Sequence, residues 1–344
     1  MGWERVWLGF ARGLRVRFCD RDVALGRLLR LAEEGGWSPW VVYGPEGCGK
    51  TSLFRQAVEV FRGCGYSVVW INPLSEDVGE RIVATEDVRD LIVSVMRDYG
   101  GLPESLAKLV DIGIAVAYRV LRRRVGGRLV VFADDIFQAV GLDRAETYVK
   151  ALLNLVEHPP GRYEKVAIVI ATSEGVSRER VGRHSWAYLY AMWNMPKEGF
   201  RELYEQIPGD KPSFEDVWRW TGGNPRFLGK LYEVGWNVDR VVGWLIRGRS
   251  IDRLVAMLPE GERDLLAEAV YDPDVLWENL ARREAQDLVC RLIERNLIME
   301  MFDRVEDAWI DVPPPERDLD LGIGRRFAWQ TPLHREAVRR VLNV

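Results

Sequence analysis

The sequence predicts an α/β fold, in which helices cover a parallel sheet and a smaller helical part follows. Over the first two thirds of the chain, short apolar runs rich in β-branched residues alternate with longer stretches of helical periodicity. This is the pattern of strands joined by crossover helices. Glycine and proline clusters separate these stretches at residues 100–101, 126–127 and 159–161, where an element is expected to stop. The strand pattern fades beyond Pro196.

The predicted elements follow one another in chain order. The expected strands are residues 40–43, 67–71, 129–133, 166–172 and 187–193. The expected helices are residues 24–34, 50–62, 86–97, 104–123 and 145–157. A chain of 344 residues is expected to form two or three domains, and these elements make residues 1–196 an α/β domain.

The remaining residues are predicted to be mainly helical. Residues 197–250 have the pattern of a small helical module, and residues 251–344 that of three helices followed by a hairpin. The hairpin is expected to join residues 297–301 to residues 326–329 through a polar loop that contains prolines. Three helices and a hairpin predict a winged helix for residues 251–344.

Composition excludes several classes of protein. The longest apolar stretch outside the predicted sheet, residues 112–121, is interrupted by Arg119 and is too short to span a membrane. The amino terminus lacks the apolar segment and the cleavage site of a secretory signal, so we expect a cytoplasmic protein without a membrane partner. The four cysteines show no paired spacing, which predicts free thiols and no metal site built from them.

A glycine-rich loop carries the strongest chemical signal. Residues 44–51 have the sequence Gly-Pro-Glu-Gly-Cys-Gly-Lys-Thr, directly after an apolar strand and directly before a helical pattern. In this context the glycines let backbone N–H groups converge on phosphate oxygens, and the helix adds its positive amino-terminal end. The residues predicted to bind a cofactor here are Gly44, Pro45, Glu46, Gly47, Cys48, Gly49, Lys50, Thr51 and Ser52.

The loop predicts ATP with Mg²⁺ as the ligand. Lys50 is expected to contact the β- and γ-phosphates, and the Thr51 hydroxyl to ligate Mg²⁺. The chain has no Asn/Thr-Lys-x-Asp motif of the kind that reads guanine, which favours ATP over GTP. The Cys48 thiol lies beside Lys50 and a helix amino terminus, so we expect it to be reactive when no nucleotide shields it.

A second strand ends in two acids. The run Leu-Val-Val-Phe-Ala at 129–133 is followed by Asp134 and Asp135. We expect Asp134 to hold Mg²⁺ through water, and Asp135 to orient or deprotonate the attacking water. Asp135 is shorter than the glutamate usual at this position, which predicts slow hydrolysis. The alternative is that the two acids only end a buried strand at the surface.

The next strand ends in hydroxyl side chains. Thr172 and Ser173 are expected beside the γ-phosphate, where they can sense it. The alternative for Thr172 is a cap on the following helix. Downstream, Arg178, Arg180 and Arg183 are candidates for a charge that stabilises the transition state, or they form a solvated helix face. His184 is expected to be structural.

Together these motifs resemble the archaeal ATPase family of the STAND class, the signal-transduction NTPases with numerous domains, which are relatives of AAA+ proteins and of origin-recognition ATPases. Residues 18–22, Phe-Cys-Asp-Arg-Asp, resemble the family's F-x-x-R-E box, which lies near the adenine. Residues 134–138, Asp-Asp-Ile-Phe-Gln, resemble its D-E-F-Q signature, and residues 222–225, Gly-Gly-Asn-Pro, its G-G-N-P motif. The resemblance covers residues 18 to about 230.

The resemblance implies a P-loop nucleotide domain of the AAA+ and STAND kind over residues 1–196, a helical lid at 197–250 and a winged-helix domain at 251–344. It implies that Arg21 lies near the adenine and that Pro225 touches the nucleotide from the lid. It also implies that Arg226 is a sensor arginine that reaches the γ-phosphate. Asp22 and Asp135 depart from the family pattern, which has glutamate at both positions.

Three functions remain open at this point. The first is an ATP-driven conformational switch that acts on an unknown protein partner, and the second is a DNA-binding initiator or loader. The third is a scaffold that binds nucleotide without hydrolysing it. Residues 251–344 hold thirteen arginines and twenty acidic residues, a net charge of −7, which disfavours DNA. A local basic face remains possible if five arginines gather: Arg325, Arg326, Arg335, Arg339 and Arg340.

Overall fold

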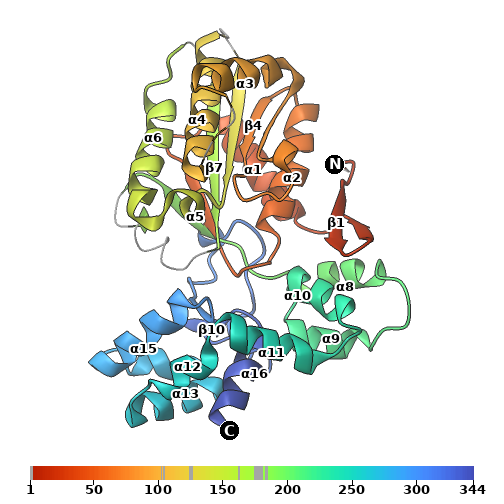
Figure 1. The fold of residues 1–344 in the computed structure, drawn as a ribbon, viewed down its shortest axis with the longest axis vertical. Helices are drawn as coiled ribbons and strands as arrows, with labels where there is room; N and C mark the ends of the chain where they lie inside the picture. Colours follow the sequence, from red (N-terminus) through yellow and green to blue (C-terminus); the bar gives the residue numbers. More distant parts are fainter. Residues whose placement is uncertain are drawn as a thin grey trace.

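The computed structural model describes residues 3–101, 103, 105–123, 127–161, 163–173, 181–182 and 185–344. Figure 1 shows an α/β part above two groups of helices. The small hairpin of β1 (Trp7–Ala11) and β2 (Leu14–Arg17) lies between the α/β part and α10 (Pro225–Glu233). Both groups of helices therefore follow the sheet in sequence and lie on the same side of it.

A mixed sheet forms the centre of the α/β part. Its strands lie in the order β5-β4-β6-β7-β3-β8, and β5 alone of these six is antiparallel to its neighbour. The bounds are β3 Trp40–Tyr43, β4 Ser67–Ile71, β5 Ile82–Ala84, β6 Arg128–Asp134, β7 Lys165–Thr172 and β8 Tyr188–Ala191. Register places Tyr43 opposite Thr172, and Asp134 opposite Ala171. The carboxyl ends of β3, β7 and β6 therefore lie side by side.

Alternate residues of each strand face two different layers of helices. Val42, Val130 and Val169 pack in one core with α1 (Asp22–Glu34) and α2 (Lys50–Gly63). Their neighbours Val41, Val131 and Ile168 pack in a second core on the opposite face. The helices of that face are α3 Glu86–Asp98, α4 Leu106–Arg123, α5 Ile136–Val140 and α6 Ala145–Glu157. Burial on both faces explains why the strands are continuous apolar runs.

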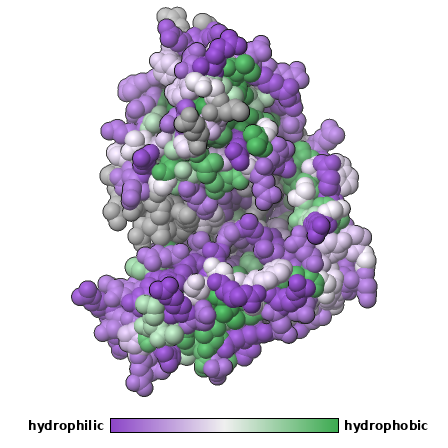
Figure 2. All heavy atoms as spheres, viewed as in Figure 1, coloured by the Kyte–Doolittle hydropathy of each residue, from purple (hydrophilic) through white to green (hydrophobic). Residues whose placement is uncertain are grey.

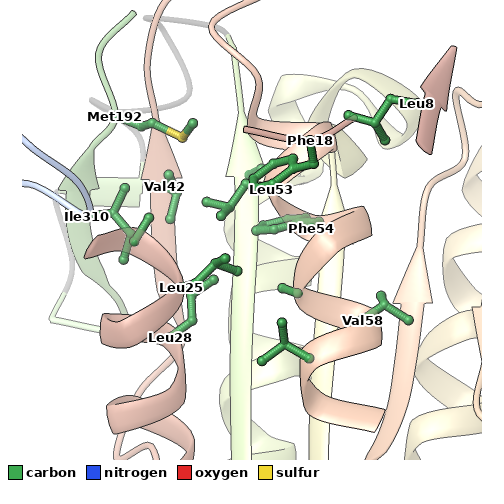
Figure 3. Close-up of a cluster of buried hydrophobic side chains, with 14 of the residues drawn as sticks. Leu8, Phe18, Leu25, Leu28, Val42, Leu53, Phe54, Val58, Met192 and Ile310 are labelled. Atoms are coloured by element: carbon green, nitrogen blue, oxygen red, sulfur yellow. The ribbon is translucent and has the colours of Figure 1, made fainter. Parts of the chain in front are cut away.

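Segments from far apart in the sequence contribute to the first core. Figure 3 shows Leu8 and Phe18 from the amino-terminal segment beside Phe54, and Ile310 from the carboxy-terminal segment beside Val42. Ile310 is fully buried, and its N–H donates to the Ala191 carbonyl at 2.8 Å. The segment at 309–310 thus extends the sheet beyond β8, where Ala191 and Trp309 form a parallel bridge.

The helices beyond the sheet divide between two cores. α8 (Lys197–Glu205) and α9 (Phe214–Thr221) contribute Phe200 and Val217 to the core under α1 and α2. The other helices are α11 Val238–Gly248, α12 Ile251–Ala256, α13 Glu260–Tyr271, α14 Val275–Glu278, α15 Arg283–Glu294 and α16 Pro332–Leu342. Phe227 and Val241 pack with Leu288 in one core. A cut between residues 250 and 251 would divide this core, so the three-part division stays a proposal.

The carboxy-terminal part carries the hairpin expected from the sequence. β9 (Ile298–Glu300) pairs antiparallel with β10 (Phe327–Trp329). Met299 and Ala328 of this hairpin share a fourth core with Tyr43 at the end of β3. The hairpin is therefore packed against the end of the strand that precedes the glycine-rich loop.

Most strands and helices predicted for the α/β part lie within one or two residues of the observed bounds. The strand expected at 187–193 is shorter, because it spans Tyr188–Ala191. The sequence did not predict β1, β2 or β5, which have three to five residues each and partly exposed side chains. Among the described residues, no helix is both long and apolar enough to span a membrane.

Candidate functional site

The glycine-rich loop connects β3 to α2, as the sequence predicts. Gly49 is the residue before α2 and has a φ of 104°, and Gly47 has a φ of 80°. Residues with a side chain rarely adopt this backbone conformation. Space is also restricted, because a Cβ on Gly44 would lie 1.9 Å from the Met192 carbonyl oxygen and one on Gly47 would lie 2.3 Å from the Arg226 Cβ. Glycine is therefore required at these positions of the loop.

Lys50 is the first residue of α2 and is only 6% exposed. Its Nζ donates hydrogen bonds to the carbonyl oxygens of Gly44 at 3.0 Å and Pro45 at 3.1 Å. The loop thus curls around its own ammonium group. With the free N–H groups at the start of α2, this places positive charge where an anionic phosphate would lie.

Asp134 ends β6 and is 1% exposed. Burial, together with the neighbouring Asp135 charge, raises the pKa of Asp134 from 3.8 to about 7, although the Thr51 hydroxyl and Lys50 lower it. Among the described residues, neither carboxylate oxygen of Asp134 accepts a hydrogen bond of good geometry. A buried carboxylate without such partners is costly, and a bound cation would stabilise its charged form.

Asp135 follows β6 in the left-handed conformation, with a φ of 47°. This conformation is uncommon for residues other than glycine. The Asp135 Oδ1 accepts hydrogen bonds from the Ser173 N–H at 3.3 Å and the Ser173 Oγ at 3.2 Å. The end of β7 therefore holds the Asp135 carboxylate in place.

The two hydroxyl residues at the end of β7 have different surroundings. Thr172 is 1% exposed and lies opposite Tyr43, between the strand of the glycine-rich loop and the strand of Asp134. Ser173 lines a cavity that also reaches the glycine-rich loop. Of the two, Ser173 has the side chain that faces this cavity.

The cavity has a volume of about 500 Å³ and brings most of the predicted residues together. It lies where the face drawn in Figure 2 is hollowed between the α/β part and the helices below it. Its lining includes predicted residues from four segments: Glu46, Gly47, Gly49, Lys50, Thr51, Ser52, Asp135, Ser173, Pro225 and Arg226. A second, apolar cavity of about 50 Å³ shares Gly49, Ser52 and Pro225 with it.

Arg21 borders the small apolar cavity, but its guanidinium group is directed elsewhere. It donates to the Asp311 carboxylate at 2.6 Å, the Cys48 carbonyl at 2.8 Å and the Trp193 carbonyl at 2.9 Å. Burial lowers the pKa of Arg21, but its neighbours, Asp311 first among them, together outweigh burial and raise the pKa above its usual value. Arg21 therefore joins the glycine-rich loop to a carboxy-terminal segment.

The segment 222–226 contacts the glycine-rich loop directly. Asn224 Nδ2 donates to the Glu46 carbonyl at 3.0 Å, and the Arg226 N–H donates to the Gly47 carbonyl at 3.3 Å. The Arg226 side chain forms an ion pair with Glu46. Pro225 is the first residue of α10 and lines both cavities. Proline is favourable at this position because its missing N–H would have no helical partner.

The expectation of a reactive Cys48 is wrong for this structure. Cys48 is 0% exposed, and its Sγ lies 3.7 Å from the Met192 carbonyl oxygen. The sequence argument considered the charge around the thiol but not its accessibility. Arg178, Arg180, Arg183 and His184 lie outside the described residues.

Two charged partners of predicted site residues were not expected from the sequence. Arg249 follows α11 and forms a second ion pair with Glu46, and Asp311 is the partner of Arg21. Both contacts join residues that are more than two hundred positions apart. No local motif marks either residue.

Comparison with solved structures shows the fold. The Walker-type ATPase PABY2304 of Pyrococcus abyssi has 14% identity and a TM-score of 0.50, covering 94% of this chain and 96% of that chain. Cdc6p from Pyrobaculum aerophilum has 13% identity and a TM-score of 0.38, covering 95% and 96%. The ORC1 protein of Aeropyrum pernix, solved in complex with DNA, has 14% identity and a TM-score of 0.39, covering 95% and 92%.

At 14% identity the likeness to PABY2304 supports the α/β fold with its mostly parallel central sheet and nothing finer. No curated protein gives a significant match. The family model described as an ATPase domain predominantly from Archaea matches residues 18–231. This range contains the glycine-rich loop, both acids at the end of β6 and the segment 222–226, so the chain belongs to this family of ATPases.

Proposed function

We propose that this protein is an ATP-driven conformational switch of the STAND class, in which residues 197–250 form a lid that closes on Mg-ATP. One observation carries the proposal: Arg226 of this lid lines the same cavity as Lys50 and Thr51 of the glycine-rich loop. A phosphate bound by the loop would therefore face a cation from another part of the fold. Such a contact can report whether the γ-phosphate is present.

The chain offers a complete set of residues for Mg-ATP. Gly47 and Gly49 open the loop for close approach of phosphate, and Lys50 provides the point charge. Thr51 and Asp134 would hold Mg²⁺, and among the residues that the structure describes, neither oxygen of the buried Asp134 carboxylate accepts a hydrogen bond of good geometry. Mg²⁺ supplies neutralisation of the phosphate charge when bound. The donor set is oxygen only, which suits this ion.

The residues for hydrolysis are Asp135 and its partner Ser173. Asp135 lines the cavity and is held by two hydrogen bonds from Ser173, so its carboxylate can orient water and accept a proton. Its side chain is one methylene shorter than glutamate, which weakens its reach toward the water. We therefore propose slow turnover, as a switch requires, with Ser173 beside the terminal phosphate. Thr172 is 1% exposed and takes no direct part in this proposal.

The base would lie toward the small apolar cavity. Leu8 and Phe10 of β1, Phe18 and Met195 line this cavity, next to Gly49 and Ser52. Its volume of about 50 Å³ is far below that of typical ligand pockets. Entry of adenine therefore requires the β1–β2 hairpin or α10 to move. In this proposal Arg21 supports the base site by fixing the Cys48 carbonyl, and does not contact the base.

The proposed output is the carboxy-terminal part, residues 251–344, as a winged-helix domain that acts on a protein partner in the cytoplasm. Gln330, just before α16, accepts a hydrogen bond from the Glu46 N–H at 3.1 Å. Gln330 also accepts, through its carbonyl, from Asn194 Nδ2 at 2.8 Å. These contacts connect the glycine-rich loop with the carboxy-terminal part.

DNA loading is the weaker alternative, because the basic residues on which it depends have partners. Arg339 and Arg340 both form ion pairs with Glu336 at 2.7 Å. Arg335 donates to the carbonyl oxygens of Leu319 and Asp320. Arg325 and Arg326 lie within 3.4 and 3.6 Å of Glu316 and Asp303 respectively. Paired arginines release few counterions from DNA.

Steady-state ATP hydrolysis tests the proposal, and it also separates a switch from a scaffold that does not hydrolyse. Parent protein is expected to release phosphate slowly in Mg-ATP, and Asp135→Asn is expected to bind ATP with turnover lower by about a hundredfold or more, in the range that general acid–base residues contribute. Asp143→Asn, in the nearby segment after α5, serves as the control and should match the parent. ATP binding without any turnover in the parent would favour the scaffold.

A further inference from the structure

Glu46 of the glycine-rich loop is held by two arginines on opposite sides. Its Oε1 pairs with Nη1 of Arg226, and its Oε2 pairs with Nη2 of Arg249. Burial raises the pKa of Glu46, but Arg249 and Arg226 outweigh burial and lower it below its usual value. The carboxylate is therefore charged, and each of its oxygens has its own arginine.

Arg226 lines two cavities, and Arg249 lines one of the two. Arg226 is 49% exposed at its side chain and lines the large cavity together with Lys50 and Thr51. Arg249 is 25% exposed and lines a separate cavity of about 290 Å³ between α10 and α11. Glu46 and Arg226 line both cavities and form the wall between them. A phosphate in the large cavity can therefore reach Arg226, whereas Glu46 lies between that cavity and Arg249.

The backbone of Arg249 is held at the end of α11. Its N–H donates to the Leu245 carbonyl at 2.9 Å at the end of α11. Ser250, which follows, has a φ of 49° in the left-handed conformation and precedes α12. His334, fully buried near Glu46 and Arg249, has a pKa lowered to about 3, mainly by burial, so it is neutral and brings no competing charge. Glu46 thus pairs with two cations, of which Arg226 is the more exposed and Arg249 the more buried.

We propose that Arg249 is a positioning residue that retains Glu46 while Arg226 exchanges the Glu46 carboxylate for the γ-phosphate of ATP. The inference rests on the proposed ATP site. Without a second cation, Glu46 would keep Arg226, because its carboxylate is only 30% exposed and would lose its ion-pair partner in partly desolvated surroundings. Arg249 stabilises the Glu46 charge at the moment Arg226 leaves. It thereby sets how strongly the site prefers ATP over ADP, which lacks the γ-phosphate.

The test is the ratio of ADP to ATP dissociation constants, measured by competition with a fluorescent nucleotide at fixed Mg²⁺. Arg226→Gln should bring the ratio close to one, a fall of about tenfold for one charge-assisted hydrogen bond. Arg249→Gln should lower the ratio several-fold with ADP affinity unchanged. The double variant Glu46→Gln/Arg249→Gln should recover the parental ratio or exceed it, because no carboxylate remains to hold Arg226.

Recovery of the parental ratio in the double variant would show that Arg249 positions Glu46 and does not merely stabilise the fold. If Arg249 only stabilised the fold, Arg249→Gln would weaken both nucleotides equally and the second substitution would restore nothing. Arg247→Gln, on the exposed face of the same helix end, is the control and should keep the parental ratio. Should Arg249→Gln not fold, Glu46→Gln alone decides, since releasing Arg226 should raise the ratio at least threefold and no rise overturns the proposal.

The ATP site and the role of Arg249 can be overturned separately. A parent protein that binds neither nucleotide would overturn the ATP site and this inference together. A parent that prefers ATP, with an unchanged ratio in Arg249→Gln, would overturn the role of Arg249 and leave the ATP site intact.

Discussion

Arg21 and Asp311 form a buried ion pair at 2.6 Å, with side chains only 3% and 2% exposed. The pair joins the segment before α1 to the loop between β9 and β10, and Arg21 also holds the Cys48 carbonyl of the glycine-rich loop. The nucleotide site and the carboxy-terminal part therefore share one buried charge pair. Any motion between them must keep this pair or separate it.

Breaking this pair should destabilise the protein strongly. Asp311→Asn leaves the Arg21 charge buried without its counter-ion, which is expected to cost about 3 to 5 kcal/mol of unfolding free energy. The double variant Arg21→Met/Asp311→Leu should lose less than Asp311→Asn alone, because no buried charge remains. Urea unfolding of the three proteins measures this. Equal losses in the single and double variants would show that packing, and not charge, holds the segment.

The raised pKa of Asp134 predicts that the protein becomes less stable as the pH rises. The folded pKa of Asp134, about 7, lies above the usual value of 3.8, so between these values the folded state binds more protons than the unfolded state. Stability from this group is complete below about pH 4, falls as the pH rises, and is constant above about pH 7. Asp134→Asn should remove the fall, which reaches at most about 1.4 kcal/mol per pH unit.

The contribution of Asp134 is measured as the difference in stability between the parent and Asp134→Asn, because His334 changes stability with pH in the opposite direction. Its pKa of about 3 lies below 6.5, so its contribution to stability rises between these values as the pH rises. Unfolding of the parent and of Asp134→Asn from pH 4 to 8, without Mg²⁺ or nucleotide, isolates Asp134. The surface variant Asp210→Asn should track the parent. A difference independent of pH would contradict the raised pKa.

The rate at which each cysteine is alkylated should follow its exposure. Cys64 and Cys290 are exposed, whereas Cys19 and Cys48 are buried. Burial also raises the pKa of Cys19 to about 12, which removes the reactive thiolate. Brief alkylation followed by peptide mass spectrometry should modify Cys64 and Cys290 alone, with or without Mg-ATP, and urea should expose all four. Rapid labelling of Cys48 in the native protein would mean that the glycine-rich loop opens.

The full chain should not bind duplex DNA with submicromolar affinity at physiological salt. Residues 251–344 have a net charge of −7, and the arginines of α16 are paired with Glu336. Fluorescence anisotropy with a labelled duplex across a salt series measures this. Tight binding that weakens steeply with salt, and that Arg339→Gln/Arg340→Gln reduces, would promote the DNA-loading alternative.

Local signals in the sequence were enough to predict the phosphate loop and the strands around it. β3, β6 and β7 are continuous apolar runs, and each is followed by residues that mark its end, such as Gly44 or Asp134. The short strands β1 and β5 carry no such pattern, because each gains its place from a neighbouring strand. Their formation depends on pairing and not on local periodicity.

Contacts between distant segments could not be predicted in the same way. Glu46 appeared as one variable position of a loop, yet its partners are 180 and 203 residues away. Cys48 was judged by the charges near it in sequence, while its burial comes from Met192 and the packing beneath the loop. Arg21 was placed near the base by resemblance, and the structure shows that its guanidinium group binds Asp311.

The melting temperature of parent and Lys50→Ala, with and without Mg-ATP, tests the central claim most directly. A ligand that binds only the folded state at one hundred times its dissociation constant adds about 2.7 kcal/mol, which should raise the melting temperature of the parent by a few degrees. Lys50→Ala should show no such rise, because it lacks the charge on the phosphates, and the control Lys108→Ala should behave as the parent does. Stabilisation of Lys50→Ala equal to that of the parent would contradict the phosphate site.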